Sequence, residues 1–156
     1  MDTNRKRPPR LVHVFQSIRD PLYFVTMVTW QRQPLLANPV VLEAFVERTT
    51  RQADIGIAVG RFVIMPDHIH LFVGISPGQT LGETVKHIKQ SITKALRYTK
   101  PDLRVWQPGF FDHLLRNGES YRAKWSYVQD NPVRARVCTD ANEWPYQGEI
   151  VRIERT

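Results

Sequence analysis

Hydrophobic and polar positions along the chain follow first the period of a strand and then that of a helix. Residues 23–30, YFVTMVTW, are rich in aromatic and β-branched side chains and predict a strand. Asn38 followed by Pro39 marks a helix start, with asparagine as the cap and proline in the first turn. Apolar residues then recur at helical spacing, so this helix is expected to run to about Ala53.

A β-hairpin is predicted next, with strands over residues 56–65 and 68–74 and a Pro-Asp tight turn between them. Because side chains alternate across a strand, His68 and His70 share one face. The opposite face carries the core side chains Ile69, Leu71 and Val73. Two imidazoles side by side on a strand can chelate one metal ion, which makes this strand a candidate active site.

A second helix is predicted over about residues 81–98, because Thr80 and Glu83 match the capping-box pattern T-x-x-E. Its apolar face holds Val85, Ile88, Ile92, Ala95 and Leu96, and its opposite side holds Lys86, Gln90, Lys94 and Arg97. A basic helix side of this kind is usually solvated, and a groove for nucleic acid is the alternative.

Residues 103–115 contain one or two short strands, and a last helix is predicted over about residues 120–130. This helix should end near Asn131, because the proline at 132 disfavours helical geometry in the residue before it. The order is then strand, helix, strand, strand, helix, strand, helix. The first six elements match a ferredoxin-like βαββαβ sheet. We therefore predict an α+β fold with helices packed on one face of the sheet, plus a C-terminal helix.

The expected domain organisation is a basic N-terminal arm (1–20), one folded domain (21–137) and a polar C-terminal tail (138–156). Within the tail, Trp144-Pro145-Tyr146 is the expected docking point. The arm is expected to be disordered when free and is a candidate clamp for a phosphate backbone. Its basic residues are Arg5, Lys6, Arg7 and Arg10.

The chain is basic, with a formal net charge of +7 and a pI of about 9.9. This excess favours a polyanionic partner, nucleic acid before membrane. The single cysteine, Cys138, rules out an internal disulfide framework and fits a reducing cytoplasm. No apolar run approaches the length of a membrane span, and the N-terminus is charged rather than signal-like. We expect a cytoplasmic protein without a membrane partner.

The last helix carries a candidate nucleophile. Its apolar face is expected to bury Tyr121, Trp125 and Val128. Tyr127 falls elsewhere, and its neighbours on the helix surface are Lys124, three residues before it, and Asn131, four residues after it. A phenol, an ammonium and an amide on one face suit phosphate chemistry.

A metal ion is the expected cofactor, because a phenol has a pKa of about 10 and is a poor nucleophile at neutral pH. A divalent ion makes phosphorus electrophilic and neutralises the developing charge. His68 and His70 are candidate ligands, with the side-chain oxygen of Asn131 as a third. Nitrogen and oxygen ligands suit Mg²⁺ or Mn²⁺ better than a closed structural zinc site. Lys124 is expected to stabilise the transition state or the leaving oxygen.

Each of these features has a structural explanation when taken alone. A histidine pair on a strand can be incidental, a helix tyrosine often packs, and Asn-Pro-Val can simply end a helix. Their joint occurrence in a basic chain favours the chemical interpretation.

Four segments carry a family resemblance over about residues 23–137: YFVTMVTW, VIMPDHIHLFV, VWQPGFFDHLLR and YVQDNPVRARV. With them the chain resembles the REP-associated tyrosine transposases, which belong to the HUH-type single-strand transposases. That superfamily carries histidine-hydrophobic-histidine on a strand and one nucleophilic tyrosine on a later helix. Here these are His68-Ile69-His70 and Tyr127.

The resemblance implies a catalytic domain over 21–137 that cleaves single-stranded DNA. Tyr127 would become joined to the 5′-phosphate, and His68, His70 and Asn131 would bind the divalent metal. Family members recognise hairpin-forming repetitive extragenic palindromes, so single-stranded or hairpin DNA is the implied partner. Tyr121 is the weaker nucleophile, because it lies on the apolar face and has no asparagine four residues later. Monomer or homodimer, and action of the tyrosine within its own or a partner subunit, remain open alternatives.

DNA contacts are expected from the basic arm, from Lys86 and from an aromatic group that would stack unpaired bases. The aromatic group comprises Trp106, Phe110 and Phe111, with core packing as the alternative for at least one of them. Two other functions explain part of the pattern. One is a non-catalytic module that binds hairpin DNA or RNA on the same fold. The other is a metal phosphohydrolase that uses water and forms no covalent intermediate.

Overall fold

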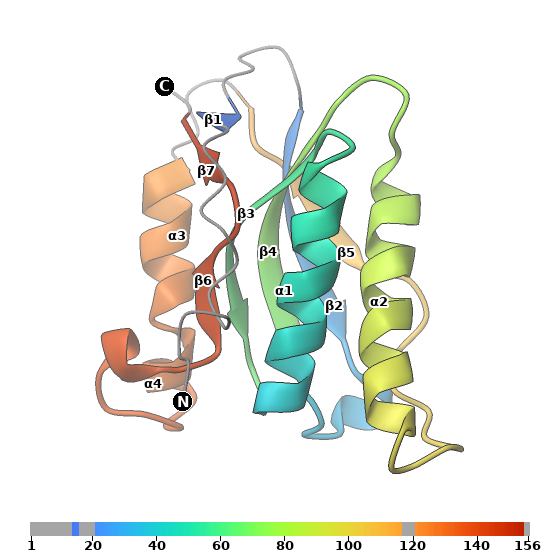
Figure 1. Ribbon diagram of the computed structural model, residues 1–156. Helices are drawn as coiled ribbons and strands as arrows, with labels where there is room; N and C mark the ends of the chain where they lie inside the picture. Colours follow the sequence, from blue (N-terminus) through green and yellow to red (C-terminus); the bar gives the residue numbers. More distant parts are fainter. Residues whose placement is uncertain (1–13, 16–20, 117–120, 155–156) are drawn as a thin grey trace, which may run out of the picture.

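The computed structural model describes residues 14–15, 21–116 and 121–154, which build a five-stranded antiparallel sheet with helices on both faces (Figure 1). The strand order is β5-β2-β4-β3-β6. Its strands are β2 (Leu22–Val28), β3 (Ile57–Ile64), β4 (His68–Ile75), β5 (Phe111–Leu114) and β6 (Gln147–Glu149). The predicted histidine strand is therefore β4, at the centre of the sheet between β2 and β3.

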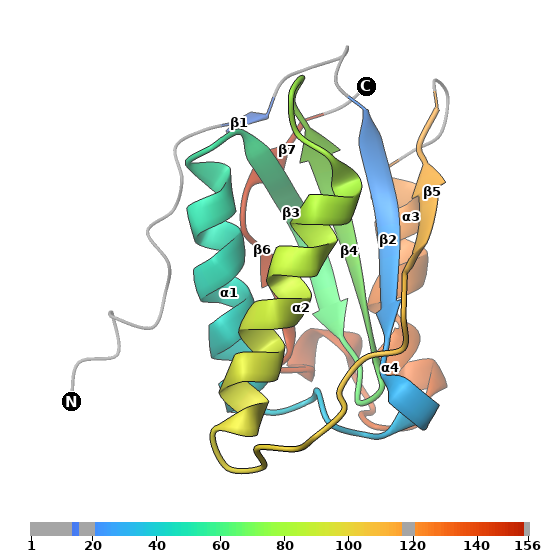
Figure 2. The same cartoon turned by 90° about the vertical axis from the view of Figure 1, so that its right-hand side faces the viewer.

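The helices form two layers. α1 (Pro39–Ala53) and α2 (Leu81–Arg97) lie side by side on one face of the sheet, and α3 (Tyr121–Gln129) and α4 (Asn131–Arg134) lie on the other (Figure 2). Along the chain the elements follow as β2-α1-β3-β4-α2-β5, with strands in the spatial order β5-β2-β4-β3. This is the ferredoxin-like arrangement, so the predicted fold is confirmed.

Both predicted helix caps form. The side-chain oxygen of Asn38 accepts from the Val41 amide at 3.0 Å, and the Thr80 hydroxyl accepts from the Glu83 amide at 3.2 Å. Each cap satisfies one of the amides that the first helical turn leaves without a partner. The caps fix where α1 and α2 begin. The apolar faces of these two helices bury Phe45, Ile88 and Ile92 against the sheet.

The other face of the sheet packs on α3 through a second apolar cluster. Tyr121, Trp125 and Val128 of α3 are buried there, as their spacing predicts. The Tyr121 ring stacks on Phe72 of β4 with centroids 4.5 Å apart. This cluster ties α3 to the strand that carries the histidines.

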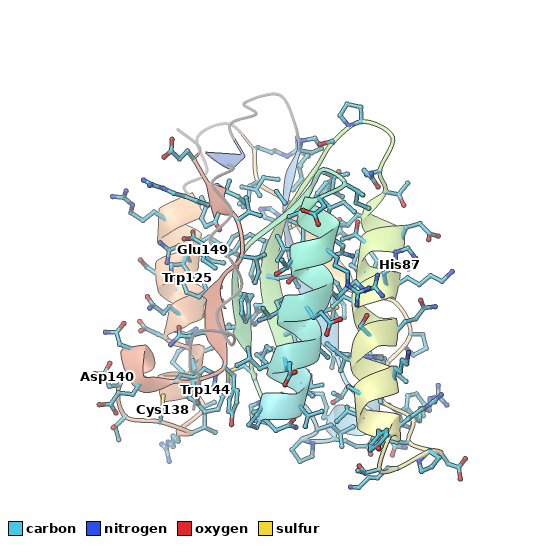
Figure 3. All side chains as sticks on the ribbon, viewed as in Figure 1. His87, Trp125, Cys138, Asp140, Trp144 and Glu149 are labelled. Atoms are coloured by element: carbon cyan, nitrogen blue, oxygen red, sulfur yellow. The ribbon has the colours of Figure 1, made fainter. Side chains whose placement is uncertain are left out.

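The C-terminal segment is more structured than the predicted tail. Trp144 docks as expected: it is buried, and its indole nitrogen donates to the Ile64 carbonyl at 3.0 Å. Beyond it, β6 pairs with β3, and β7 (Arg152–Ile153) pairs in parallel with β1 (Val14–Phe15). Figure 3 labels Trp125 and Trp144 in this part of the molecule, beside α3 and β6.

Two predicted boundaries differ from the structure. The strand expected over 23–30 ends at Val28, because the next two amides, of Thr29 and Trp30, bond to the Asp67 and Val105 carbonyls instead. A 3₁₀ turn, Trp30–Arg32, follows. The helix expected over 120–130 ends at Gln129, and a new turn begins at Asn131, because proline fits the first turn of a helix.

The basic arm residues Arg5, Lys6, Arg7 and Arg10 lie outside the described residues. Within the described ranges, no helix is long and apolar enough to cross a membrane.

Gly60 of β3 is a point of close approach, and substituting it is expected to destabilise the fold. A Cβ built on Gly60 would collide with the Tyr121 hydroxyl and would lie 2.6 Å from the Ile153 Cδ1 atom. Overpacking of this kind costs about 1–3 kcal/mol, so Gly60→Ala should lower the free energy of unfolding by that amount in urea titrations. Gly82→Ala is the control, because a Cβ there meets nothing within 4 Å. Equal stability of the two variants would contradict this packing.

Candidate active site

The two histidines of β4 lie on the face of the sheet that α3 and α4 cover. Their ring centroids are 4.7 Å apart, and the ring planes meet at 74°. The Phe24 ring of β2 stacks on His70 at 5.1 Å, and the Lys124 ammonium of α3 lies 4.8 Å from the Phe24 centroid. Between the histidines, Ile69 points into the core on the α1 and α2 side. The predicted alternation is confirmed.

Each imidazole is held through its Nδ1 atom. His68 Nδ1 lies 2.7 Å from the Asp67 Oδ1 atom, and His70 Nδ1 lies 2.8 Å from the Thr26 hydroxyl. A carboxylate only accepts, so His68 carries its proton on Nδ1 and has its lone pair on Nε2. With Nδ1 engaged in both rings, the Nε2 atoms are the positions that suit a metal ion.

The pKa of His70 is lowered to about 3, first by burial and then by the charges of His68, Lys124 and Arg134. His70 is therefore neutral at physiological pH, which is the protonation state that binds metal. The Lys124 ammonium also lies over the Phe24 ring that stacks on His70, so α3 lies beside the histidine pair.

The low pKa of His70 predicts a pH-dependent stability. In the unfolded chain His70 has its ordinary pKa of 6.5, so it takes up a proton there before it does in the folded protein. The free energy of unfolding should therefore fall as the pH drops below 6.5 toward 3. At about 1.4 kcal/mol per pKa unit, the expected cost by about pH 5 is about 2 kcal/mol.

Urea unfolding of metal-free protein in EDTA at neutral and acidic pH measures this effect. His70→Gln should remove this component of the pH slope, and His87→Gln, at an exposed position on α2, should keep it. Equal slopes in wild type and His70→Gln would show that the burial of His70 has no such effect.

Tyr127 is the accessible tyrosine of α3, with 66% of its surface exposed. The Arg134 guanidinium lies 4.1 Å from the Tyr127 ring centroid and donates to the Tyr127 carbonyl at 2.7 Å. It also donates to the Asn131 Oδ1 atom at 2.9 Å. Arg134 thus joins the tyrosine to the asparagine four residues later. Arg134 is not among the site residues predicted from the sequence, although it lies in the segment Asn-Pro-Val-Arg that follows the tyrosine helix.

Tyr121 is buried, and its hydroxyl accepts from the Arg61 amide at 2.8 Å. Burial also raises the pKa of the Tyr121 phenol, which disfavours the phenolate. These contacts make Tyr121 a packing residue and favour Tyr127 as the nucleophile.

The residues predicted to contact DNA are dispersed. Lys86 is exposed on α2, across the sheet from the histidines. Trp106 is half-buried and donates from its indole nitrogen to the Lys89 carbonyl at 3.1 Å, and Phe110 packs against the core. Phe111 is the exposed member of the aromatic group, at 61%. Core packing therefore accounts for Phe110 and for part of Trp106.

The side chains present fit a divalent ion held by the histidine pair. Two imidazoles with Nδ1 engaged leave their Nε2 atoms as candidate metal ligands on one face of the sheet. Among the described residues, no group of three histidine, cysteine, aspartate or glutamate side chains is placed to hold a metal. The predicted third ligand, Asn131, is of another type, and its amide oxygen accepts from Arg134 in this structure.

Comparison with known proteins agrees with this geometry. The family model described as "Transposase IS200 like" matches residues 18–131. The chain is 27% identical to the REP-associated tyrosine transposase of Escherichia coli K12, over 56% of this chain and 52% of that protein. It is 26% identical to an uncharacterized protein of Haemophilus influenzae, over 49% of this chain and 55% of that protein.

One solved structure, of a REP-associated tyrosine transposase bound to a REP hairpin, superposes with a TM-score of 0.66. Its sequence identity is 22%, and the match covers 90% of this chain and 82% of that one. This likeness confirms the fold.

The fold and the family match together define the class as a transposase domain. The chain belongs to the IS200-like transposase family, whose model covers most of its length. The predicted resemblance to REP-associated tyrosine transposases is confirmed. The chain spans about half the length of the curated relatives it matches.

Proposed function

We propose that the protein is a metal-dependent single-stranded DNA endonuclease and strand transferase that uses Tyr127 as its nucleophile. One observation carries this proposal. Lys124, three residues before Tyr127 on α3, has its ammonium 4.8 Å from the Phe24 ring, and that ring stacks on His70 at 5.1 Å. The tyrosine helix thus faces the histidine pair of its own chain, which supports action within one subunit.

In the proposed reaction the Tyr127 hydroxyl oxygen attacks the scissile phosphorus and loses its proton to solvent. The bond from phosphorus to the 3′ oxygen breaks, and that oxygen takes up a proton to become a 3′-hydroxyl. The product is a 5′-phosphotyrosine, which preserves the phosphodiester bond energy, so rejoining needs no ATP. Lys124 and Arg134 would neutralise negative charge on the phosphate oxygens during the attack.

His68 and His70, through their Nε2 atoms, and Asn131 would hold the Mg²⁺ or Mn²⁺ ion. Bound there, the ion supplies Lewis-acid polarisation of the phosphate. The Asn131 Oδ1 atom accepts one hydrogen bond from Arg134, and its second lone pair would be the one offered to the ion.

The proposed substrate is hairpin-forming repetitive DNA with an adjoining single strand. Support comes from the REP-associated relative and from the structural neighbour bound to a REP hairpin. The basic charge of the chain agrees with this partner. We further propose a cytoplasmic location, where the free thiol of Cys138 would stay reduced.

The test is a denaturing gel of protein incubated with a labelled hairpin oligonucleotide and Mn²⁺. Label at the 3′ end should migrate with the protein, and label at the 5′ end should appear as a shorter free strand. Cleavage without labelled protein would indicate a hydrolase that uses water. Binding without cleavage would indicate a non-catalytic module. EDTA should prevent both products.

A further inference from the structure

Asp67 bridges two side chains, His68 and Arg32, at the start of β4. Its Oδ1 atom lies 2.7 Å from His68 Nδ1, and its Oδ2 atom lies 3.0 Å from Arg32 Nε. The carboxylate is half-buried, and Arg32 is largely exposed. An exposed ion pair adds little to stability. The bridge therefore calls for an explanation other than stability.

The segment that supplies Arg32 has an unusual backbone. Gln31 and Arg32 are consecutive residues with positive φ, 55° and 56°, although neither is glycine. Residues other than glycine adopt this conformation at an energetic cost, and such residues cluster at functional sites. Here one of the two residues, Arg32, has its guanidinium in contact with the Asp67 carboxylate, which in turn holds His68.

Backbone contacts already hold this turn without the Asp67 side chain. The Thr29 amide and hydroxyl both bond to the Asp67 carbonyl, at 3.0 and 3.2 Å, and the Leu36 amide bonds to the Pro66 carbonyl at 2.9 Å. Arg104 stacks on Trp30 at 3.5 Å and adds a further clamp. The Asp67 carboxylate is thus not needed to attach the segment, and its two oxygens are free to serve His68 and Arg32.

We infer that Asp67 and Arg32 are positioning residues for His68. Asp67 fixes the proton on Nδ1 and leaves Nε2 to face a metal ion, while Arg32 orients the carboxylate. Thr26 has the corresponding contact with His70. The part of this inference that concerns metal affinity rests on the proposed function. The part that concerns the His68 tautomer does not.

The tautomer is measured by long-range ¹H–¹⁵N NMR of metal-free full-length protein with labelled histidine, assigned with His68→Gln. Wild type should show His68 protonated on Nδ1. Asp67→Ala should shift His68 toward the Nε2-protonated form, and Asp67→Asn, which keeps an acceptor oxygen and the residue size, should retain the Nδ1 proton. Asp102→Ala, an exposed acid in the turn after α2, is the control and should change nothing.

The second readout is the affinity of the protein for Mn²⁺ in the absence of DNA, measured by electron paramagnetic resonance. Asp67→Ala should weaken Mn²⁺ affinity about 10–100-fold, the range for partners that orient a ligating histidine. Arg32→Gln should cost less, and Arg32→Lys should recover part of the loss.

The outcomes separate the two proposals. If wild type binds no Mn²⁺, the proposed metal site fails, and the NMR result still tests the positioning of His68. If wild type binds Mn²⁺ and folded Asp67→Ala keeps both the affinity and the tautomer, the positioning role is overturned. If Asp67→Ala fails to fold, Asp67→Leu, which also lacks an acceptor oxygen, takes its place, and a wild-type tautomer and Mn²⁺ affinity in that variant would overturn the positioning role.

Discussion

Tyr127→Phe is expected to abolish the covalent protein–DNA adduct while leaving hairpin binding intact. The substitution removes one oxygen atom from an exposed side chain, so neither the apolar cluster under α3 nor the Arg134 stack on the ring is lost. Removal of a nucleophile typically costs about a thousandfold or more in rate. Adduct formation on denaturing gels should therefore fall to background, and fluorescence anisotropy with labelled hairpin DNA should give the wild-type affinity.

Tyr121→Phe is the matched control on the same helix. It removes the hydroxyl that accepts from the Arg61 amide, and loss of such a bond typically costs about 1 kcal/mol of stability. The adduct should persist in this variant. An adduct that survives in Tyr127→Phe and disappears in folded Tyr121→Phe would reverse the assignment of the nucleophile.

Local sequence rules sufficed for the elements that build the site. Asn38 and Thr80 are caps whose effect depends on the next few residues alone, and both form as predicted. The two-residue period of a strand separated the histidines from Ile69, and the helical period separated Tyr127 from the buried Tyr121. These patterns are short-range, so one sequence reveals them.

Contacts between distant segments could not be derived in this way. Arg134 contacts Tyr127 because the helix is interrupted between α3 and α4. The sequence predicted only that a helix ends near Asn131, and not the second helical turn that carries Arg134. The ion pair between Arg32 and Asp67 depends on a turn with positive φ at Gln31 and Arg32. Neither residue is glycine, so the sequence gives no signal for this backbone conformation. The pairing of β6 with β3 likewise joins residues far apart in sequence, and the polar composition of that segment indicated a tail.

His68→Ala is expected to remove metal-dependent cleavage while the fold and hairpin binding persist. Partners that merely orient a ligating histidine affect metal affinity or activity about 10–100-fold, so loss of a ligand itself should cost more than about a hundredfold in cleavage rate. His68 is preferred to His70 for this test, because the His70 ring stacks on Phe24 and its loss would disturb that packing. His87→Ala is the control, since His87 lies on α2 on the far side of the molecule from α3 (Figure 3).

The Mn²⁺ dependence of the residual cleavage rate distinguishes a variant that has lost a metal ligand from one that has lost the nucleophile. A variant without one ligand binds metal weakly, so raising Mn²⁺ should recover part of the activity of His68→Ala and none of that of Tyr127→Phe.

A mixture of the two variants adds a test of subunit arrangement. Because α3 packs on β4 of the same chain through Tyr121 and Phe72, we expect the mixture to stay inactive. Adduct formation restored in the mixture would mean that the nucleophile comes from a second copy of the chain. In the separate assay of His68→Ala, unchanged cleavage would exclude His68 as a metal ligand.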